Sequence, residues 1–377
     1  MKRLAINALL LDPQAGGIAV YIKNLIDGIL QENAEDWMPK IIMRREIMRA
    51  YGYHGGSEFL PVRVPTKPVL RIFAEIILLH NLLQTNRIDL LHAPISYYLP
   101  NGGVPTIITV HDLRILHFPE SYVPMRRYFL QRAIPWAAHH AFHIIAVSHF
   151  TKNNLMQRLN VPAEKVTVIH SGISFERFNI TFCKGERERV RSRYGLPEKY
   201  FLAVGHLEPR KNYERLIEAF SILRRRGIPH HLVIVGRENW QVYSIYERVR
   251  KLGLSGTVHF TRFVAPTDLP IIYQSSQVFV APSLFEGFGF TPLEAMAAGV
   301  PVAVSNAASH PEICQNAALY FDPFDPKDMA DKLELLLDDN SLRQELINRG
   351  FENIRRFSWK TCISQTLRVY QKCLMSV

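Results

Sequence analysis

Short runs that are apolar at nearly every position alternate along this chain with longer amphipathic segments. Strands of this kind are buried on both faces, as they are in parallel sheets. Strands that alternate with helices predict βαβ units and a parallel α/β fold. In the first half the expected strands are Leu4–Leu10, Ile88–His92, Thr106–Val110, His143–Val147 and Val166–Ile169, and the expected helices include Ile18–Leu30, Tyr122–Ala138 and Phe150–Leu159.

The alternation weakens between residues 174 and 197, where Cys183–Arg193 is polar and charged, and then restarts. We therefore expect two doubly wound, Rossmann-like domains at 1–173 and 197–356, a linker at 174–196 and a closing helical segment at 357–377. The chain of 377 residues is long enough for two separate cores. In the second half the expected strands are Phe201–Val204, Leu232–Val235, Val258–Phe260, Val278–Ala281 and Val300–Val304, and the expected helices are Tyr213–Arg225, Val242–Lys251, Pro292–Ala298 and Lys327–Leu337.

A formal net charge of +11 is spread over both halves of the chain. No zinc-finger or RNP-like signature accompanies this charge, so we expect no nucleic-acid partner. An anionic substrate and an anionic membrane surface are the partners that the charge favours. Two stretches bear on the membrane. Val69–Leu83 is apolar but too short and interrupted to span a bilayer, and Met125–Trp136 mixes arginines with aromatic residues as an interfacial helix does. Two core helices with solvated edges remain the alternative for both.

Two further features indicate a reducing cytosol. The N-terminal apolar run stops at Asp12-Pro13 without a cleavage site, which favours a first strand over a signal peptide. The four cysteines are widely scattered and show neither metal-ligand nor disulfide spacing.

Functional side chains are expected beyond the carboxyl ends of the strands, facing a cleft between the two domains. Gly16-Gly17 opens the first helix, where glycines let the backbone approach a phosphate or a sugar; a plain tight turn is equally compatible. His111-Asp112 follows the strand Thr106–Val110 directly. There, His111 can hydrogen-bond a substrate or shuttle a proton, or it can serve the structure by bonding nearby backbone.

The second half carries the more specific residues. Arg210 and Lys211 stand just before a helix that Asn212 could cap, and two cations beside free backbone N–H groups suit a diphosphate. After the strand Val278–Ala281, Glu286 lies in a glycine-rich loop and Glu294 in the first turn of the next helix. A capping box of Thr291 and Glu294, with Pro292 at the first helical position, is the structural alternative for Glu294. That alternative leaves Glu286 unexplained.

Glu286 and Glu294, separated by seven residues, resemble the E-x7-E motif of retaining glycosyltransferases, in particular family 4 of the GT-B type. The resemblance covers essentially the whole chain, because the other elements follow in the family's order. These are Gly16-Gly17, His111-Asp112, Gly205, Arg210-Lys211-Asn212, Leu232–Gly236, Ser305, Pro311-Glu312 and the closing helix at Phe357-Ser358-Trp359, which in such folds crosses back to the first domain.

The resemblance implies a role for each matching residue. Glu294 would hold the ribose hydroxyls, Glu286 would contact hydroxyls of the transferred sugar, and Arg210 and Lys211 would neutralise the leaving diphosphate. His111 would face the donor sugar, and we expect it to act with Lys211 and Glu286 as the catalytic residues. The remaining donor-binding positions would be Gly16, Gly17, Gly236, Gly287, Phe288, Gly289 and Phe290. Some relatives carry arginine where this chain has His206.

The implied activity is transfer of a hexose from a nucleotide diphosphate donor, with retention at the anomeric carbon. The chain has no Asp-x-Asp triplet, so we expect no essential metal ion and no cofactor. The segment Gly205–Asn212 and the Ser-His-Pro-Glu segment resemble bacterial mannosyltransferases of surface-polysaccharide assembly. They favour GDP-mannose as donor, with a UDP-hexose or dTDP-rhamnose next. The expected acceptor is a saccharide or polyprenyl-linked saccharide, and the expected location is cytoplasmic, peripheral at the inner face of the membrane.

Two other classes of protein share the architecture. A nucleotide-sugar 2-epimerase acts on a donor alone, and free epimer without acceptor would reveal it. A non-catalytic two-domain sugar-binding protein would normally carry an export signal, and it gives Arg210 and Lys211 no diphosphate to face.

Overall fold

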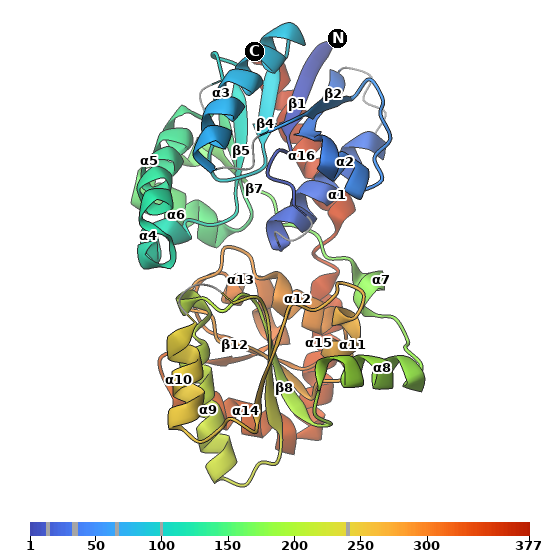
Figure 1. The fold of residues 1–377 in the computed structure, drawn as a ribbon, viewed down its shortest axis with the longest axis vertical. Coiled ribbons are helices and arrows are strands. Elements are labelled where there is room, and N and C mark those ends of the chain that lie inside the picture. Colours follow the sequence, from blue (N-terminus) through green and yellow to red (C-terminus); the bar gives the residue numbers. More distant parts are fainter. Residues whose placement is uncertain (13–15, 32–36, 65–67, 99–100, 239–241) are drawn as a thin grey trace. The chain divides into compact units, whose positions relative to one another are not determined.

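A computed structural model describes residues 1–12, 16–31, 37–64, 68–98, 101–238 and 242–377, with the backbone alone for 68–76. The chain forms two compact units. The first unit consists of Met1–His117, Tyr122–Gly172 and Trp359–Val377, and the second of Phe118–Ser121 and Ile173–Ser358. Each unit is built on one parallel sheet, and Figure 1 shows helices beside both sheets.

Within the described residues, the sheet of the first unit has seven strands in the order β3-β2-β1-β4-β5-β6-β7. All of the strand pairs are parallel. The order reverses between β1 and β4, which makes their carboxyl ends the switch point where ligands of such sheets bind. The strands are β1 Lys2–Asn7, β2 Trp37–Arg44, β3 Phe59–Val62, β4 Leu90–Ala93, β5 Thr106–Val110, β6 His143–Ala146 and β7 Val166–Val168.

Helices cover both faces of this first sheet. Inward residues of β1 and β2 pack against α1 (Gly17–Gln31) and against α16 (Trp359–Leu374) near the end of the chain. On the other face, α3 (Pro68–Thr85), α5 (Pro124–His140) and α6 (His149–Leu159) complete two further apolar clusters. The shorter helices are α2 Arg45–Ala50 and α4 Arg114–His117. In the described part of the chain, no helix is both long and apolar enough to cross a membrane.

The sheet of the second unit, as far as the structure describes it, has six parallel strands in the order β10-β9-β8-β11-β12-β13. Its order reverses between β8 and β11, so their carboxyl ends form the second switch point. The strands are β8 Tyr200–Val204, β9 His231–Val235, β10 Val258–Arg262, β11 Val278–Ala281, β12 Val302–Ser305 and β13 Leu319–Phe321. The helices are α7 Phe175–Phe178, α8 Lys184–Tyr194, α9 Tyr213–Arg225, α10 Tyr243–Lys251, α11 Leu269–Gln274, α12 Phe290–Ala297, α13 His310–Cys314, α14 Pro326–Asp338 and α15 Asn340–Ile354.

The two doubly wound sheets confirm the α/β, Rossmann-like class that the apolar runs predict. Strands β2, β3 and β13 were not expected. In β2 the apolar run is interrupted by Pro39 and Lys40, and in β3 by Pro61. Because β3 is an edge strand, its proline costs no ladder hydrogen bond on the outer side. A short edge strand of this kind leaves little apolar signal in the sequence.

Residues 174–196, for which we expected a linker, belong to the second unit and form α7 and α8. The buried carboxylate of Asp268 anchors α8. It accepts hydrogen bonds from Arg189 at 2.8 Å, Arg193 at 3.1 Å and the Tyr194 hydroxyl at 2.9 Å. Three donors compensate the cost of burying the charge. The polar composition of α8 thus reflects a charge-anchored helix.

The last helix, α16, is part of the first unit, although the whole second unit precedes it in the sequence. It lies close against α1, since a Cβ added to Gly28 would come within 2.6 Å of Ile363 Cγ1. The Tyr370 hydroxyl and Nδ1 of His92 lie 2.5 Å apart, and Nε2 of His92 lies 2.8 Å from Thr109 Oγ1. Burial lowers the pKa of His92 to about 3. The ring is therefore neutral and joins β4, β5 and α16.

Candidate active site

The carboxyl ends of β8 and β9 meet in a contact between two glycines. Gly205 follows β8 with φ +148°, a conformation that favours glycine. A Cβ added to Gly236, after β9, would lie 1.9 Å from the Gly205 carbonyl oxygen. That oxygen accepts a hydrogen bond from the Tyr213 hydroxyl at 3.0 Å. Gly236, which we expected in donor binding, therefore has a packing requirement of its own.

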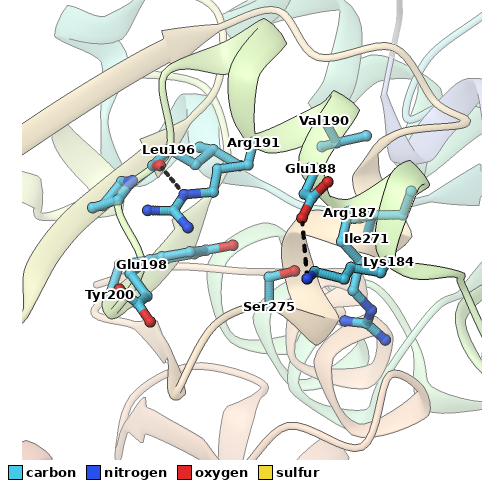
Figure 2. A pocket seen from close by; sticks show the side chains of 11 residues that line it. Lys184, Arg187, Glu188, Val190, Arg191, Leu196, Glu198, Tyr200, Ile271 and Ser275 are labelled. Carbon is cyan, nitrogen blue, oxygen red and sulfur yellow. Dashed lines mark hydrogen bonds and ion pairs between the residues drawn. The ribbon is translucent and has the colours of Figure 1, made fainter.

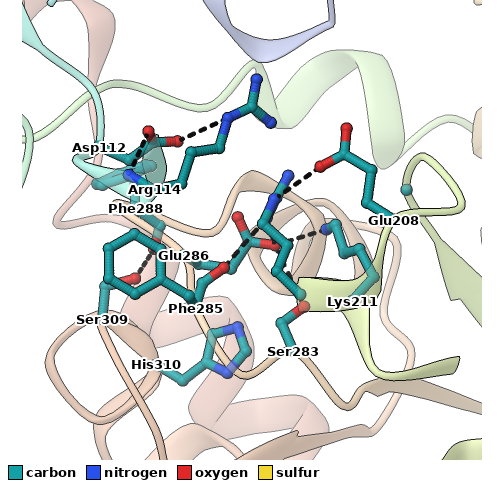
Figure 3. Close-up of polar contacts among 12 residues, drawn as sticks. Asp112, Arg114, Glu208, Lys211, Ser283, Phe285, Glu286, Phe288, Ser309 and His310 are labelled. Atoms are coloured by element: carbon teal, nitrogen blue, oxygen red, sulfur yellow. Dashed lines mark hydrogen bonds and ion pairs between the residues drawn. The ribbon is translucent and has the colours of Figure 1, made fainter. Parts of the chain in front are cut away.

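Four charged side chains of the second unit form one group, which we term the charge cluster: Glu208, Arg210 and Lys211, which are buried, and Glu286, whose side chain is 15% exposed (Figure 3). Oε1 of Glu286 lies 2.8 Å from Arg210 Nη1 and 2.6 Å from Lys211 Nζ. Nε of Arg210 lies 2.9 Å from Oε2 of Glu208. The cluster thus balances two cations with two carboxylates.

The loop after β8 is tied to the loop after β11. The Leu284 amide donates to the Arg210 carbonyl at 2.7 Å, and Arg210 Nη1 donates to the Phe285 carbonyl at 3.1 Å. Asn212 adopts φ 59° and donates from its side chain to the Pro282 and Pro323 carbonyls. Its side chain does not cap α9, because its Oδ1 accepts a hydrogen bond from Arg215 Nη1 at 3.1 Å instead of a helix amide.

Glu286 remains ionised in these surroundings. Burial alone would raise its pKa, but the charges of Arg210 and Lys211 outweigh burial and hold the pKa well below the ordinary range. The Ser283 hydroxyl donates to Oε1 of Glu286 at 3.2 Å. Glu286 therefore offers carboxylate oxygens as hydrogen-bond acceptors at any assay pH.

Glu294 has a different environment. Burial raises its pKa, and a hydrogen bond from the Tyr273 hydroxyl to Oε2, 2.8 Å long, opposes that rise. The capping box that the sequence allows is not formed: α12 begins at Phe290, directly after Gly289 with φ 98°. With no cap to satisfy, the Glu294 carboxylate takes a side-chain partner from α11.

The glycine-rich loop before α12 is also packed from behind. The Phe288 ring is buried and contacts the rings of Phe290 and Phe357. The Ser309 hydroxyl donates to the Phe288 carbonyl at 2.8 Å (Figure 3). Gly289 lies beside His310, since an added Cβ would come within 3.5 Å of the His310 ring. The side chain of Phe288 therefore serves packing, and contact with a ligand would fall to the backbone of Gly287–Gly289.

His310 stands behind the charge cluster as a neutral group. Burial lowers its pKa to about 4, against the opposing charge of Glu286. Its Nδ1 lies 2.8 Å from the Ser305 hydroxyl. The Ser305 hydroxyl also donates to the Ser283 carbonyl at 2.6 Å, which links the ends of β11 and β12.

The first unit holds the other expected residues. Gly16 has φ +64°, and Gly17 begins α1; residues 13–15 lie outside the described part. His111 follows β5, where its Nε2 lies 3.1 Å from the Pro94 carbonyl and its ring stands edge-on to Tyr21. Burial lowers the pKa of His111, although Pro94 and Asp112 oppose the shift. A carbonyl only accepts, so Nε2 carries the proton and Nδ1 is the acceptor of a neutral ring.

Three residues of this site were not singled out from the sequence: Glu208, Tyr273 and His310. Glu208 stands two positions before Arg210, and that spacing was the available signal. Tyr273 lies in a different helix from Glu294, 21 residues away, and His310 belongs to a segment named only for its resemblance. Contacts between distant segments leave no pattern in a single sequence.

A separate pocket of about 250 Å³ lies beside α8, with Lys184, Arg187 and Tyr200 in its lining (Figure 2). Tyr200 is the first residue of β8, so the pocket lies at the amino end of the strand. The charge cluster follows the carboxyl end of the same strand. The pocket is therefore distinct from the candidate active site.

The arrangement suits a ligand that combines phosphates with hydroxyl groups. Arg210 and Lys211 can donate charge-assisted hydrogen bonds to phosphate oxygens. Glu286 and Glu294 can accept hydrogen bonds from hydroxyls, and the charge of Lys211 is close enough to lower the pKa of Glu294. Glu208 holds Nε of Arg210, which orients the guanidinium group.

Both halves of the chain match family models. Residues 186–353 match the model described as glycosyl transferases group 1, and residues 15–177 match that of glycosyltransferase family 4. O-antigen chain mannosyltransferase B of Escherichia coli is 30% identical over 282 residues, covering 74% of this chain and 73% of that protein. The serotype-specific mannosyltransferase WbdA of Escherichia coli is 28% identical over 286 residues. That match covers 74% of this chain but only 35% of WbdA.

Solved structures share the whole fold at low identity. Sucrose-phosphate synthase from Thermosynechococcus elongatus superposes with a TM-score of 0.75 at 19% identity, and the match covers 100% of both chains. Anabaena Alr3699/HepE in complex with UDP and glucose gives 0.74 at 18% identity, over 99% of this chain and 100% of that chain. These matches show that the chain, with its two parallel-sheet units, has the GT-B fold.

Proposed function

The chain belongs to glycosyltransferase family 4, of the GT-B type, and from that membership we propose that it is a retaining mannosyltransferase that uses GDP-mannose. The proposed acceptor is a saccharide or a lipid-linked saccharide. The proposed place of action is the cytoplasmic side, peripheral at the inner face of the membrane. No metal ion or cofactor is essential in this proposal.

The position of the charge cluster carries the proposal. Glu208–Lys211 follow β8 and Glu286 follows β11, and β8 and β11 are the paired strands at which the strand order reverses. Ligands of doubly wound sheets bind at this point. Two buried cations there, beside two carboxylates, fit a nucleotide diphosphate that carries a polyhydroxylated sugar.

Each residue has a defined part in the proposed reaction. When the donor enters, Arg210 and Lys211 release Glu286 and donate hydrogen bonds to oxygens of the diphosphate instead. Glu286 then accepts hydrogen bonds from hydroxyls of the sugar, and Glu294 accepts them from the ribose. As the glycosidic bond breaks, negative charge grows on the leaving phosphate, and the two fixed cations stabilise it.

The side chains that remain complete the proposal. Neutral His111 accepts a hydrogen bond from a hydroxyl of the sugar through Nδ1. The leaving phosphate takes the proton of the acceptor hydroxyl, which places the new bond on the face that the leaving group occupied. Arg210 and Lys211 supply the positive charge that an Asp-x-Asp-bound metal supplies in other glycosyltransferases, and this supports metal independence.

The choice of donor rests on relatives. O-antigen chain mannosyltransferase B of Escherichia coli and the O-antigen chain mannosyltransferase RfbU of Salmonella typhimurium are named for mannose transfer. RfbU is 32% identical over 221 residues, 58% of this chain and 57% of RfbU. Because the structures of Alr3699/HepE contain UDP or UDP-glucose, a UDP-hexose is the second donor to test.

A donor panel tests the proposal. The purified chain of 377 residues is incubated with GDP-mannose, UDP-glucose, UDP-galactose or dTDP-rhamnose, with a mannose-terminated oligosaccharide and with or without EDTA. We expect α-linked product from GDP-mannose alone, equally in EDTA, with the anomeric configuration assigned by NMR. Product from another donor would contradict the assignment of GDP-mannose. Product with inverted anomeric configuration would contradict the retaining mechanism, and loss of activity in EDTA would contradict metal independence. Free epimer formed without acceptor would identify an epimerase.

A further inference from the structure

Helix α5 of the first unit presents an exposed stripe that combines large apolar side chains with arginine. Met125 is 74% exposed, Tyr128 62% and Trp136 37%, and Arg132 is also exposed. These positions are three or four residues apart, so they share one side of the helix. We call Met125, Tyr128, Arg132 and Trp136 the α5 stripe.

The opposite side of the same helix is buried. Leu130, Ile134, Ala137 and Ala138 pack into the apolar cluster of β4, β5 and β6, beside α6 (Figure 1). The buried side of α5 therefore supplies the apolar contacts that attach this helix to the core. The aromatic residues of the stripe add exposed apolar surface that the fold itself does not need.

The formal charges on helix α5 itself are all positive. Helix α5 carries Arg126, Arg127 and Arg132 and has no acidic residue. The guanidinium of Arg132 lies 3.6 Å from the centre of the Tyr128 ring, which keeps its charge at the level of the aromatic surface. The sequence from Tyr122 to Lys165 contains six lysines and arginines but a single acidic residue, Glu164. A second acidic residue, Glu120, stands just before this stretch.

Exposed apolar residues continue at both ends of the helix. Val123 precedes α5 and is 50% exposed, and Phe142 follows it at 40%. Trp136 is steadied by its neighbours, because its ring stacks on His140 at 4.6 Å and contacts Tyr98 at 5.2 Å. A tryptophan and a tyrosine that are half exposed beside arginines suit the boundary between headgroups and acyl chains.

We propose that the α5 stripe is the face that binds an anionic lipid bilayer. Arg126 and Arg127, which are exposed in the first turn of α5, lie off the stripe and add positive charge beside it. The arginines attract the anionic headgroups, while Met125, Tyr128 and Trp136 enter the interface. The inference extends the proposed function, since it gives a lipid-linked acceptor a reason to meet the first unit. The binding itself requires neither donor nor acceptor.

Vesicle binding tests the inference. Wild-type chain is mixed with vesicles of phosphatidylcholine, or of equal parts phosphatidylcholine and phosphatidylglycerol, and bound protein is measured by sedimentation. A basic residue near an anionic surface contributes roughly a factor of five, so Arg126→Gln, Arg127→Gln and Arg132→Gln together should weaken binding to anionic vesicles about a hundredfold. Met125→Ser with Tyr128→Ser should weaken it about tenfold or more, because each removes apolar contact.

A matched variant controls for net charge. Lys184→Gln, Lys251→Gln and Lys327→Gln together remove the same charge from exposed sites of the second unit. This variant should bind as the wild type does. Equal weakening in both triple variants would overturn the inference, as would equal binding to neutral vesicles or no binding to anionic ones. Arginine-dependent binding to single-stranded RNA without vesicle binding would assign the stripe to another partner and overturn it too.

The depth of Trp136 gives a second readout. Lipids brominated along the acyl chain should quench tryptophan fluorescence of the wild type on anionic vesicles, and Trp136→Phe should remove that quenching. Quenching that persists in Trp136→Phe would overturn the placement. Transfer to the soluble mannose-terminated oligosaccharide is assayed in parallel. If the chain transfers mannose but does not bind vesicles, only the membrane inference is contradicted. If it binds vesicles but does not transfer mannose, only the proposed function is contradicted.

Discussion

The Tyr273 hydroxyl donates a hydrogen bond of 2.8 Å to Oε2 of Glu294, which joins a buried tyrosine of α11 to a partly buried carboxylate of α12. The hydrogen bond restricts how the Glu294 carboxylate can rotate. Tyr273 is thus a positioning residue for Glu294. The hydrogen bond also opposes the rise in the pKa of Glu294 that burial causes.

Tyr273→Phe should weaken donor use without unfolding the chain. A hydrogen bond to a charged group contributes about 1.5–3 kcal/mol, so KM for the donor should rise by roughly tenfold or more. With the bond gone, the Glu294 pKa rises further, so the acid limb of kcat/KM should move to higher pH. Both quantities come from steady-state kinetics over a pH series. An unchanged acid limb would contradict the positioning role.

Lys211→Met should lower kcat by about 10²–10³, the usual loss for one missing donor that stabilises the leaving group. The fold should persist, because Glu286 keeps Arg210 as its partner. Lys184→Met, at a side chain that is 90% exposed, is the matched control and should leave turnover unchanged. Near-wild-type turnover of Lys211→Met would remove the diphosphate role of Lys211.

Glu286→Gln should separate nucleotide binding from transfer. The carboxylate competes with phosphate for Arg210 and Lys211, so its removal should tighten GDP binding by about tenfold, or ~1.4 kcal/mol. Transfer should fall, because the sugar hydroxyls lose a charged acceptor. Calorimetric titration with GDP measures the first effect and initial rates the second. Weaker GDP binding would contradict the competition.

Gly236→Ala should destabilise the second unit by about 1–3 kcal/mol, because an added Cβ meets the Gly205 carbonyl at 1.9 Å and the backbone must shift. Gly256→Ala is the control, since nothing lies within 4 Å of a Cβ at that position. Urea denaturation of both variants gives the difference in free energy of unfolding. Equal stabilities would refute the close contact of the two strand ends.

His92 should make the first unit sensitive to acid. Its pKa in the folded chain is about 3, below the ordinary value of about 6.5, so the unfolded chain takes up a proton first as the pH falls. Stability contributed by neutral His92 is complete above pH 6.5 and is lost as the pH falls toward 3. Between pH 7 and pH 5 the loss is about 2 kcal/mol.

Urea denaturation at pH 7 and pH 5 measures this loss. His92→Asn removes the titrating ring, so its stability should depend less on pH, by about the same 2 kcal/mol. His54→Asn, at an exposed histidine, should keep the pH dependence of the wild type. Parallel curves for wild type and His92→Asn would contradict the prediction.

Elements that are determined by local sequence could be predicted, whereas elements that depend on a distant partner could not. β5 and β11 are buried at every residue, so their apolar runs were sufficient. α8 is a stable helix because Asp268, at least 74 residues from each donor, accepts three hydrogen bonds. No local pattern records that partner.

The same distinction applies to the candidate site. Arg210, Lys211 and Glu286 were named from sequence because strand ends concentrate functional side chains, and the structure brings these three into contact. The partner of Glu294 was not foreseen, since the sequence offered Thr291 as a local cap and the fold supplied Tyr273 from another helix. Pairing across segments depends on packing, which a single sequence does not encode locally.

The position of α16 bears on how the protein is made. Ile363, Val369 and Tyr370 of α16 complete the core formed by β1, β2 and α1, yet a ribosome synthesises them after the whole second unit. The first unit leaves the exit tunnel with that apolar groove uncovered, while residues 173–358 already hold nearly everything that their own sheet requires. Maturation should therefore run against the order of synthesis, and a nascent chain halted before residue 359 should engage chaperones through its N-terminal half.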